Sequence, residues 1–293
     1  MTPENRSATI VDLIRKSAEP VKGAEKEELY AISVRRTREL SRQCDLSCRE
    51  VELEALKQNI IPSRYLRNRS TYSAEDQIRF LEANVAVVGL GGLGGTVVEI
   101  LARAGVGRLA LIDGDRFEDH NLNRQLVSNE KNMGESKVTA ARDRLASINA
   151  AVEAAVHPTF LSSDNAIQLI RDCDVVVDCL DNIASRFVLE AAARQTGQPF
   201  VSAAVAGLTG HVTVIFPQDR GLELIYGPVD GALEAKGAEI VLGCPPQTVA
   251  LVAAKQCAEI LNLLSKRTGQ LLRNKLWVVD LSDHTTEVLS LAG

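Results

Sequence analysis

Apolar residues change their spacing near Pro62, and this change divides the chain into two regions. Residues 1–62 are rich in charge and poor in glycine, and their apolar positions recur at irregular helical spacing, which predicts two or three amphipathic helices. We therefore expect an N-terminal helical extension over residues 1–62 and one α/β domain over residues 63–293. The extension could pack on that domain or on a second copy of the chain, or it could form a separate binding module.

After Pro62, short apolar runs alternate with helical patterns. The runs predict strands at residues 85–88, 109–112, 152–156, 175–179 and 199–203, with helices between them. Apolar strands that alternate with helices are typical of a parallel sheet that helices cover on both faces. The predicted fold class is therefore α/β, with a Rossmann-like, mostly parallel sheet.

The C-terminal pattern is different. Residues 211–216 and 222–226 predict antiparallel strands on either side of a polar turn, and residues 227–245 predict a loop. A long apolar helix at 248–265 and a closing hairpin from 276–281 and 285–289 complete the expected fold.

Composition and charge narrow the classes of protein. The chain has 293 residues, of which 45% are hydrophobic and 24% charged, as in soluble globular proteins. A net charge of -5 gives no bulk attraction for nucleic acid or an anionic membrane, so we expect neither partner. The N-terminus does not resemble a signal peptide, and no apolar run approaches membrane-spanning length, so we expect a cytoplasmic protein.

The six cysteines include no C-x-x-C pair, and without an export signal we expect reduced thiols. Cys44 and Cys48 have the spacing of neighbours one turn apart on a helix. Cys173, Cys179 and Cys257 lie in apolar patterns and are expected in the core.

A glycine-rich turn is the strongest local signal for a ligand. A predicted strand runs into Gly89-Leu-Gly91-Gly92-Leu-Gly94, and a helix follows at once. Glycines allow the backbone to approach a ligand closely, and the helix N-terminus attracts phosphate. Asp113 ends the next predicted strand, where a carboxylate can accept hydrogen bonds from a ribose. The combination predicts an adenosine-containing ligand.

The residues that follow favour a nucleoside triphosphate over a dinucleotide. Arg124 and Lys137 could neutralise the β and γ phosphates. Asp181 follows a predicted strand, at the end where α/β folds bind ligands, and its carboxylate could hold Mg²⁺. Each residue has a simpler alternative, because either cation could be a surface charge and Asp181 could cap the next helix.

Taken in order, these motifs resemble the ThiF/MoeB/HesA family, which includes the adenylation domains of ubiquitin-activating enzymes. The likeness covers about residues 63–293. The motifs that carry it are Arg64-x-x-Arg67, the glycine turn, Ala104-Gly-Val-Gly107, Asp113-x-Asp115, Asn121-Leu-Asn-Arg124-Gln125, Gly134-x-x-Lys137 and Asp178-x-x-Asp181-Asn182.

The resemblance implies a set of ATP contacts and a smaller catalytic set. Asp181 would bind Mg²⁺, and Arg67 would reach ATP across a homodimer interface, although an ordinary ion pair is the alternative for Arg67. The implied catalytic residues are Arg67, Arg124, Lys137 and Asp181. The implied ATP contacts are Gly89, Gly91, Gly92, Gly94, Asp113, Asp115, His120, Asn121, Arg124, Lys137, Asp181 and Asn182.

The reaction implied by the resemblance is an adenylation. A carboxylate at the C-terminus of a small ubiquitin-like sulfur-carrier protein ending in Gly-Gly would attack the α phosphate of ATP and release pyrophosphate. The substrate supplies the nucleophile, so the protein contributes alignment and charge neutralisation.

The chain departs from the family pattern at its cysteines. Many members bind a structural zinc through two C-x-x-C pairs, and none is present here, so we expect no structural zinc. Cys244 stands next to the loop where some members carry a reactive cysteine. It could gain thiolate character from a helix N-terminus, or it could be a buried inert thiol.

Three other functions remain open at this point. A tRNA threonylcarbamoyladenosine dehydratase shares the nucleotide motifs, but the chain has no basic stripe for tRNA. A nicotinamide-dependent oxidoreductase would also use the glycine turn. A catalytically silent binding subunit is the third, and the presence of Arg124, Lys137 and Asp181 disfavours it.

Overall fold

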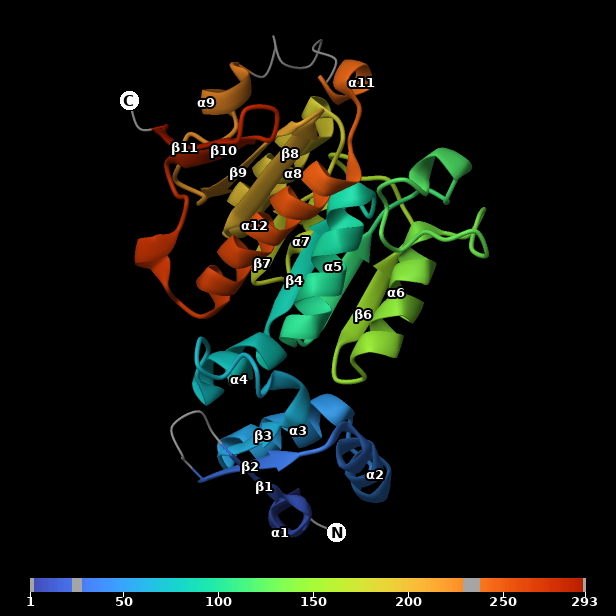
Figure 1. Cartoon of the computed structure of the whole chain (residues 1–293), viewed down its shortest axis with the longest axis vertical. Helices are drawn as coiled ribbons and strands as arrows, with labels where there is room; N and C mark the ends of the chain where they lie inside the picture. The colour runs from blue at the N-terminus through green and yellow to red at the C-terminus, as the bar shows by residue number, and fades with distance from the viewer. Residues whose placement is uncertain (1–2, 23–27, 229–237, 292–293) are drawn as a thin grey trace.

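An eight-stranded sheet forms the centre of the molecule, in a computed structural model that describes residues 3–22, 28–228 and 238–291 (Figure 1). The strand order is β11-β10-β9-β8-β7-β4-β5-β6. The strands from β8 to β6 are parallel, and β9, β10 and β11 join antiparallel. The strands are β4 (Asn84–Val88), β5 (Arg108–Ile112), β6 (Glu153–His157), β7 (Val175–Asp178), β8 (Phe200–Ala206), β9 (Thr209–Ile215), β10 (Lys275–Asp280) and β11 (Thr285–Ser290).

Helices cover both faces of this sheet, which confirms the predicted fold class. One face packs against α5 (Gly92–Ala104), α6 (Lys137–Ile148) and α12 (Pro246–Leu264), and the other against α7 (Ala166–Ile170) and α8 (Ile183–Thr196) (Figure 1). Alternate residues of β4 face the two sides, because side chains of a strand alternate between its faces. Val85 and Val87 therefore lie in one core and Ala86 and Val88 in the other.

Local sequence fixes where the helices begin and end. In α4 (Ala74–Glu82), Ser73 and Asp76 form a reciprocal capping box at the first turn. Helix α5 ends at Gly105, whose φ of 86° is in the left-handed region that glycine adopts without a steric penalty. Helix α5 therefore lies directly between the glycine turn, where it begins, and β5, which follows Gly105.

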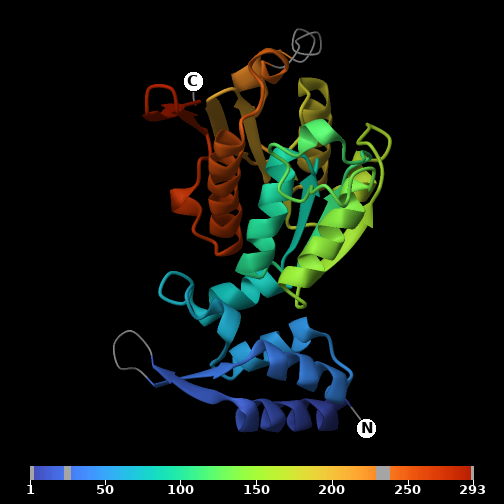
Figure 2. The ribbon, with the colours of Figure 1, turned by 45° about the vertical axis from the view of Figure 1, so that its right-hand side comes forward.

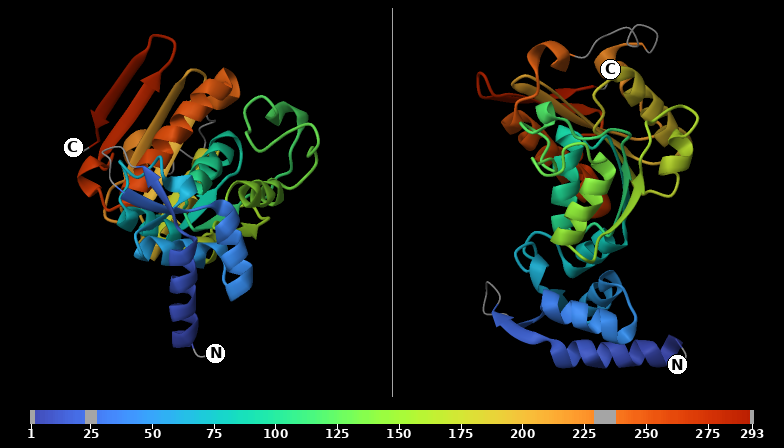
Figure 3. Two further views of the ribbon diagram at one scale, coloured as in Figure 1. Left: turned by 60° about the horizontal axis from the view of Figure 1, so that its bottom comes forward. Right: turned by 90° about the vertical axis from the view of Figure 1, so that its right-hand side faces the viewer.

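Residues 3–62 form a smaller unit at one end of the molecule (Figures 2 and 3). The described residues of this unit form three helices, where the apolar spacing predicts two or three, together with a three-stranded sheet that the spacing does not predict. The elements are α1 (Pro3–Ser17), β1 (Glu19–Lys22), β2 (Glu28–Ile32), α2 (Val34–Cys44), α3 (Cys48–Lys57) and β3 (Ile60–Pro62). The boundary at residue 62 as a domain limit stays a prediction.

Three local expectations are wrong. Residues 222–226 are not a strand, because α9 (Glu223–Tyr226) occupies them, and part of the expected loop at 227–245 is α11 (Glu239–Leu242). Residues 229–237 of that loop lie outside the described residues. Cys44 ends α2 whereas Cys48 begins α3, so they are not neighbours on one helix. Among the described residues, no helix is long and apolar enough to cross a membrane.

Candidate nucleotide-binding site

A cavity of about 650 Å³ opens at the edge of the sheet where the parallel strands have their carboxyl ends. This is the edge at which open α/β sheets bind ligands, next to the point where the strand order reverses. Here β4 lies between β5 and β7, and the segments that follow these three strands all reach the cavity. The lining includes Gly89, Gly91, Gly92, Asp113, Asp115, Arg124, Gln125, Lys137, Phe160, Asp181, Asn182 and Cys244.

The glycine turn forms the floor of the cavity. Gly89 has a φ of 87°, and a Cβ placed there would lie 2.6 Å from the carbonyl oxygen of Cys179. Gly91 is the N-cap of α5, so the first backbone amides of that helix have no hydrogen-bond partner within the helix. The N-terminal end of a helix carries a partial positive charge, which favours binding of an anion. The turn therefore offers backbone donors and a positive helix end to a phosphate.

Asp113 stands at the end of β5, and two backbone amides hold its carboxylate. Its Oδ2 accepts a hydrogen bond from Leu90 N at 2.6 Å, and its Oδ1 accepts one from Asp115 N at 2.7 Å. These bonds fix the carboxylate beside the glycine turn and leave lone pairs for further donors. The position suits ribose hydroxyls.

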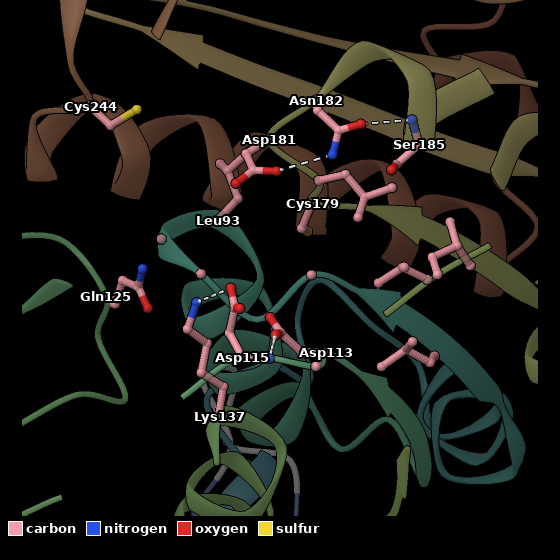
Figure 4. Close-up of a pocket in the computed structure, with 18 of the residues that line it drawn as sticks. Leu93, Asp113, Asp115, Gln125, Lys137, Cys179, Asp181, Asn182, Ser185 and Cys244 are labelled. Carbon is pink, nitrogen blue, oxygen red and sulfur yellow. Dashed lines mark hydrogen bonds and ion pairs between the residues drawn. The ribbon is translucent and has the colours of Figure 1, made fainter. Parts of the chain in front are cut away.

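The two cations expected at the phosphates line the same cavity. Lys137 begins α6, and its Nζ lies 3.1 Å from Asp115 Oδ2, so the ammonium is held at the cavity wall (Figure 4). Arg124 donates to the carbonyl of His120 at 2.9 Å, and its stem lies over Gly92. Both positive charges therefore lie near the turn, although they come from different segments.

Asp181 lies across the cavity from Lys137 (Figure 4). The cap of α8 is its neighbour Asn182, whose Oδ1 accepts from Ser185 N at 2.8 Å, so capping does not account for the Asp181 carboxylate. Behind the loop, Arg186 donates to Asp178 Oδ2 at 2.8 Å and also to the carbonyl of Leu180. This buried ion pair fixes the loop that carries Asp181.

The residues present fit a magnesium ion held jointly with phosphate oxygens. Mg²⁺ in nucleotide sites commonly takes one or two carboxylates, with waters and phosphates as the remaining ligands. Asp181 supplies a cavity-facing carboxylate of that kind. Among the described residues, no group of three or more His, Cys, Asp or Glu is placed to hold a metal ion by protein ligands alone.

Gln125 is a further candidate for a ligand contact. It belongs to the Asn121-Leu-Asn-Arg124-Gln125 motif, but the sequence alone indicates no role for it. Its side chain is buried and lines the cavity (Figure 4), and its Oε1 has no hydrogen-bond partner among the described residues. A buried amide oxygen without a partner costs about 1–3 kcal/mol, which a ligand that donates a hydrogen bond would offset. Its place directly after Arg124 was the available signal.

Four expected site residues do not line the cavity. Gly94 packs against the backbone of the glycine turn. His120 is exposed, and its Nδ1 lies 3.3 Å from Glu118 Oε2. Asn121 is buried, and its Oδ1 accepts a hydrogen bond from Glu118 N. Arg67 is exposed and lies outside the cavity lining within its own chain. Its contact with ATP across a dimer interface stays a prediction.

The cysteines divide into core residues and one cavity residue. Cys173, Cys179 and Cys257 are buried, as expected, and burial raises the pKa of the Cys179 thiol well above its ordinary value. Cys179 is therefore a protonated thiol rather than a nucleophile. Cys244 lies partly buried at the cavity, just before α12.

A model of the ThiF family matches residues 65–292, which include the whole eight-stranded sheet and the cavity. The chain belongs to the ThiF family. This membership confirms the resemblance drawn from the ordered motifs.

Relatives within the ThiF family are adenylyltransferases by name. The chain is 37% identical over 204 residues to "Adenylyltransferase and sulfurtransferase MOCS3" of Mus musculus, covering 66% of this chain and 41% of that protein. It is 35% identical over 207 residues to "Sulfur carrier protein adenylyltransferase" of Thermus thermophilus, covering 68% of this chain and 76% of that protein. The chain spans about half the length, or less, of the MOCS3 relatives it matches.

Solved structures share the fold at lower identity. PaaA matches with a TM-score of 0.66 at 18% identity, over 94% of this chain and 99% of that one. MccB of E. coli, solved with ATP, matches with a TM-score of 0.65 at 20% identity, over 87% of this chain and 79% of that one. Likeness at this identity shows the fold alone. Because the match to PaaA covers 94% of this chain, the shared fold includes most of residues 3–62.

Proposed function

We propose that this ThiF-family chain is an ATP-dependent adenylyltransferase that activates the C-terminal carboxylate of a small ubiquitin-like sulfur-carrier protein. The observation that carries the proposal is the meeting of Arg124, Lys137 and Asp181 around one cavity beside the glycine turn. These charges suit a triphosphate more than a dinucleotide. The names of the murine and Thermus relatives support the activity and the carrier.

Each residue has a defined part in the reaction. The glycine turn and Asp113 hold the nucleotide, and a carboxylate oxygen of the carrier forms a bond to the α phosphorus. The bond from that phosphorus to the bridging oxygen breaks, and pyrophosphate leaves with both bonding electrons. Arg124 and Lys137 neutralise the charge on the departing pyrophosphate.

Asp181 would hold Mg²⁺, which when bound neutralises phosphate charge. No side chain is needed as a general base, because the attacking carboxylate is already ionised at neutral pH. The protein accelerates the step by alignment and electrostatic stabilisation.

The direct test is exchange of labelled pyrophosphate into ATP, with Mg²⁺ and candidate carriers that end in Gly-Gly. We expect carrier-dependent exchange with the unaltered protein. Asp181→Asn removes the charge with little change in shape and is expected to lower the exchange rate about 100-fold or more. The matched control is Asp172→Asn, because the Asp172 side chain is 85% exposed and outside the cavity lining.

Two outcomes would contradict this assignment. Exchange by Asp181→Asn at the unaltered rate would remove the metal role of Asp181. Absence of exchange with every carrier, together with hydride transfer from a nicotinamide cofactor, would favour the oxidoreductase instead.

A further inference from the structure

Three exposed arginines, Arg35, Arg38 and Arg42, share one side of α2, and we call this set the basic face. At about 100° per residue, their side chains leave the helix within about 60° of one another. Thr37 and Leu40, which are buried, lie on the opposite side of α2. The basic face is therefore turned to solvent, in the unit at the end of the molecule remote from the nucleotide cavity (Figure 1).

The helix dipole opposes part of this arrangement. Arg35 stands in the first turn of α2, where the helix end is already partly positive and a further cation is unfavourable. In contrast, α3 and α4 place Glu50, Glu75 and Asp76 in their first turns, as the dipole favours. Arg42, in the last turn of α2, is the member of the basic face that the dipole does favour. Helix stability therefore does not explain the position of Arg35.

Ion pairing within the unit also accounts for little of the basic face. Glu39 is the one acid of α2, and it pairs with Arg35 at 2.9 Å and with Arg36 at 3.0 Å. The Arg35 side chain is 90% exposed, and a pair so exposed contributes little to stability. Arg38 and Arg42 have no ion-pair partner among the residues that the structure describes. The basic face thus presents more positive charge than α2 itself neutralises.

The spacing of the three arginines fits a second helix. Along the axis of α2, Arg35 and Arg38 are about 4.5 Å apart, and Arg38 and Arg42 are about 6 Å apart. Acids at positions i, i+4 and i+7 of an antiparallel helix repeat both spacings in the matching order. On an extended strand, acids of one face recur about every 6.7 Å and would match only the longer spacing. The geometry therefore selects a helix with acids along one side.

A nucleic acid or an anionic membrane fits this surface less well. The basic face covers about 10 Å along one helix, which is not the extended stripe that a tRNA would need. The chain as a whole has a net charge of -5, so it would repel a large polyanion that reached beyond α2. A short acidic helix contacts the arginines alone and avoids that repulsion.

We infer that the basic face of α2 docks an acidic helix of a partner protein, an interaction that goes beyond the proposed adenylation and does not depend on it. Arg38 and Arg42 pair with two carboxylates of the partner, and Arg35 exchanges Glu39 for a third. Guanidinium groups suit this role because they can bind a carboxylate through two parallel hydrogen bonds. Since the pairs form at the surface, salt screens them, and they contribute to the choice of partner more than to its affinity.

The test measures binding of a labelled helical peptide by fluorescence anisotropy in low salt. The peptide is built of alanine and glutamine over about 20 residues, long enough to form a helix, with glutamates at i, i+4 and i+7. The triple variant Arg35→Gln, Arg38→Gln, Arg42→Gln should bind it about 10-fold more weakly or worse. A second peptide, with three glutamates on different sides of the helix, should bind the unaltered protein equally weakly. If the triple variant is unfolded by circular dichroism, Arg38→Gln with Arg42→Gln replaces it and leaves the pair of Arg35 with Glu39 intact.

The matched control changes Arg142, Arg171 and Arg220 to glutamine, since these side chains of the α/β domain are 47%, 61% and 65% exposed. This control has the same net charge as the triple variant and should bind the first peptide as the unaltered protein does. Equal weakening by the two triple variants, equal binding of the two peptides, or no binding of the first peptide would overturn the inference. Tighter binding of tRNA or of phosphatidylserine vesicles than of the peptide, lost in the triple variant, would also overturn it and assign the face to that polyanion.

Discussion

Gly94 and Gly91 belong to the same turn but differ in how much room a side chain would have. A Cβ at Gly94 would lie 1.8 Å from the carbonyl oxygen of Gly89, whereas one at Gly91 would meet Gln125 Nε2 at 3.7 Å, an ordinary contact. Gly94 therefore permits close packing between the turn and α5, and Gly91 instead lines the cavity. The two glycines serve different purposes although the motif treats them alike.

We expect Gly94→Ala to lower the free energy of unfolding by about 1–3 kcal/mol or more, because backbone must move to admit the methyl group. Gly91→Ala should leave stability nearly unchanged and affect only nucleotide binding. Unfolding in urea, followed by circular dichroism, compares the two variants. Equal midpoints for them would show that the turn relaxes without cost.

The sequence predicts the glycines and several charged residues of the cavity, but it does not predict the apolar lining or the place of Gln125 in it. The spacing of the glycines and the charges of Asp113, Arg124, Lys137 and Asp181 indicate contacts with a nucleotide from the sequence alone. The case for Gln125 depends on a buried oxygen that has no partner among the described residues, and the place of Phe160 in the lining depends on its packing against Gly114. Neither property leaves a pattern in the sequence, because both depend on contacts between segments that are far apart along the chain.

At the scale of elements, the parallel strands were predictable and the strands of residues 3–62 were not. The parallel strands are apolar along their length because both faces are buried. In contrast, β1 reads Glu-Pro-Val-Lys and is largely exposed, so no apolar pattern marks it. Helix α9 reads Glu-Leu-Ile-Tyr, which fits a strand by composition, and it turns helical after Gly221, whose φ is 78°.

A buried polar cluster joins α3 to the α/β domain. Glu52 Oε1 lies 3.2 Å from Arg64 Nε, close enough for an ion pair but not aligned as a hydrogen bond. Tyr65 donates to Glu52 Oε2 at 3.0 Å, and Asn149 Nδ2 donates to the Tyr65 hydroxyl at 3.0 Å. Arg64 also donates to the carbonyl of Ile148 at 3.2 Å, which places it in this junction and not in the nucleotide cavity.

We expect Arg64→Ala to destabilise the protein by about 3–5 kcal/mol, since it leaves the Glu52 carboxylate buried without its cation. Adding Glu52→Gln to Arg64→Ala should recover part of this loss, because the uncompensated charge is then removed. Thermal unfolding of the two single variants and the double variant measures the coupling. Additive effects would mean that the two side chains do not interact.

The pH dependence of stability should also report on this cluster. Burial raises the pKa of Glu52 to about 7 from an ordinary value of 4.5, against the opposing effect of Arg64. Between these values the folded state binds the proton more tightly than the unfolded state, so this group's contribution to stability falls as pH rises from about 4.5 to 7. Glu52→Gln should remove that component from the unfolding free energy measured across this range, and an unchanged slope would contradict the raised pKa.

At the scale of the whole molecule, the unit formed by residues 3–62 and the nucleotide cavity lie at opposite ends. The unit packs below the amino ends of the parallel strands, whereas the cavity is at their carboxyl ends (Figures 1 and 2). Arg67 lies just after this unit and outside its own chain's cavity lining. A role for Arg67 at ATP therefore calls for a second copy of the chain.

We propose a homodimer in which Arg67 of one copy completes the site of the other, and mixing variants tests it. Arg67→Ala and Asp181→Ala should each abolish carrier-dependent exchange. A mixed dimer would contain one site with both residues intact, so equal mixing should restore about a quarter of the unaltered rate. No recovery, once subunit exchange is shown by mass spectrometry, would confine Arg67 to its own chain.

The junction around Glu52 and Tyr65 has an evolutionary consequence. Because residues 3–62 meet the sheet on the side remote from the glycine turn, selection can reshape their outer surface without disturbing nucleotide geometry. Homologous chains should then diverge faster over that surface than around Asp113 and Lys137. The nucleotide-binding sheet and the N-terminal unit can in this way change separately while the junction between them is kept.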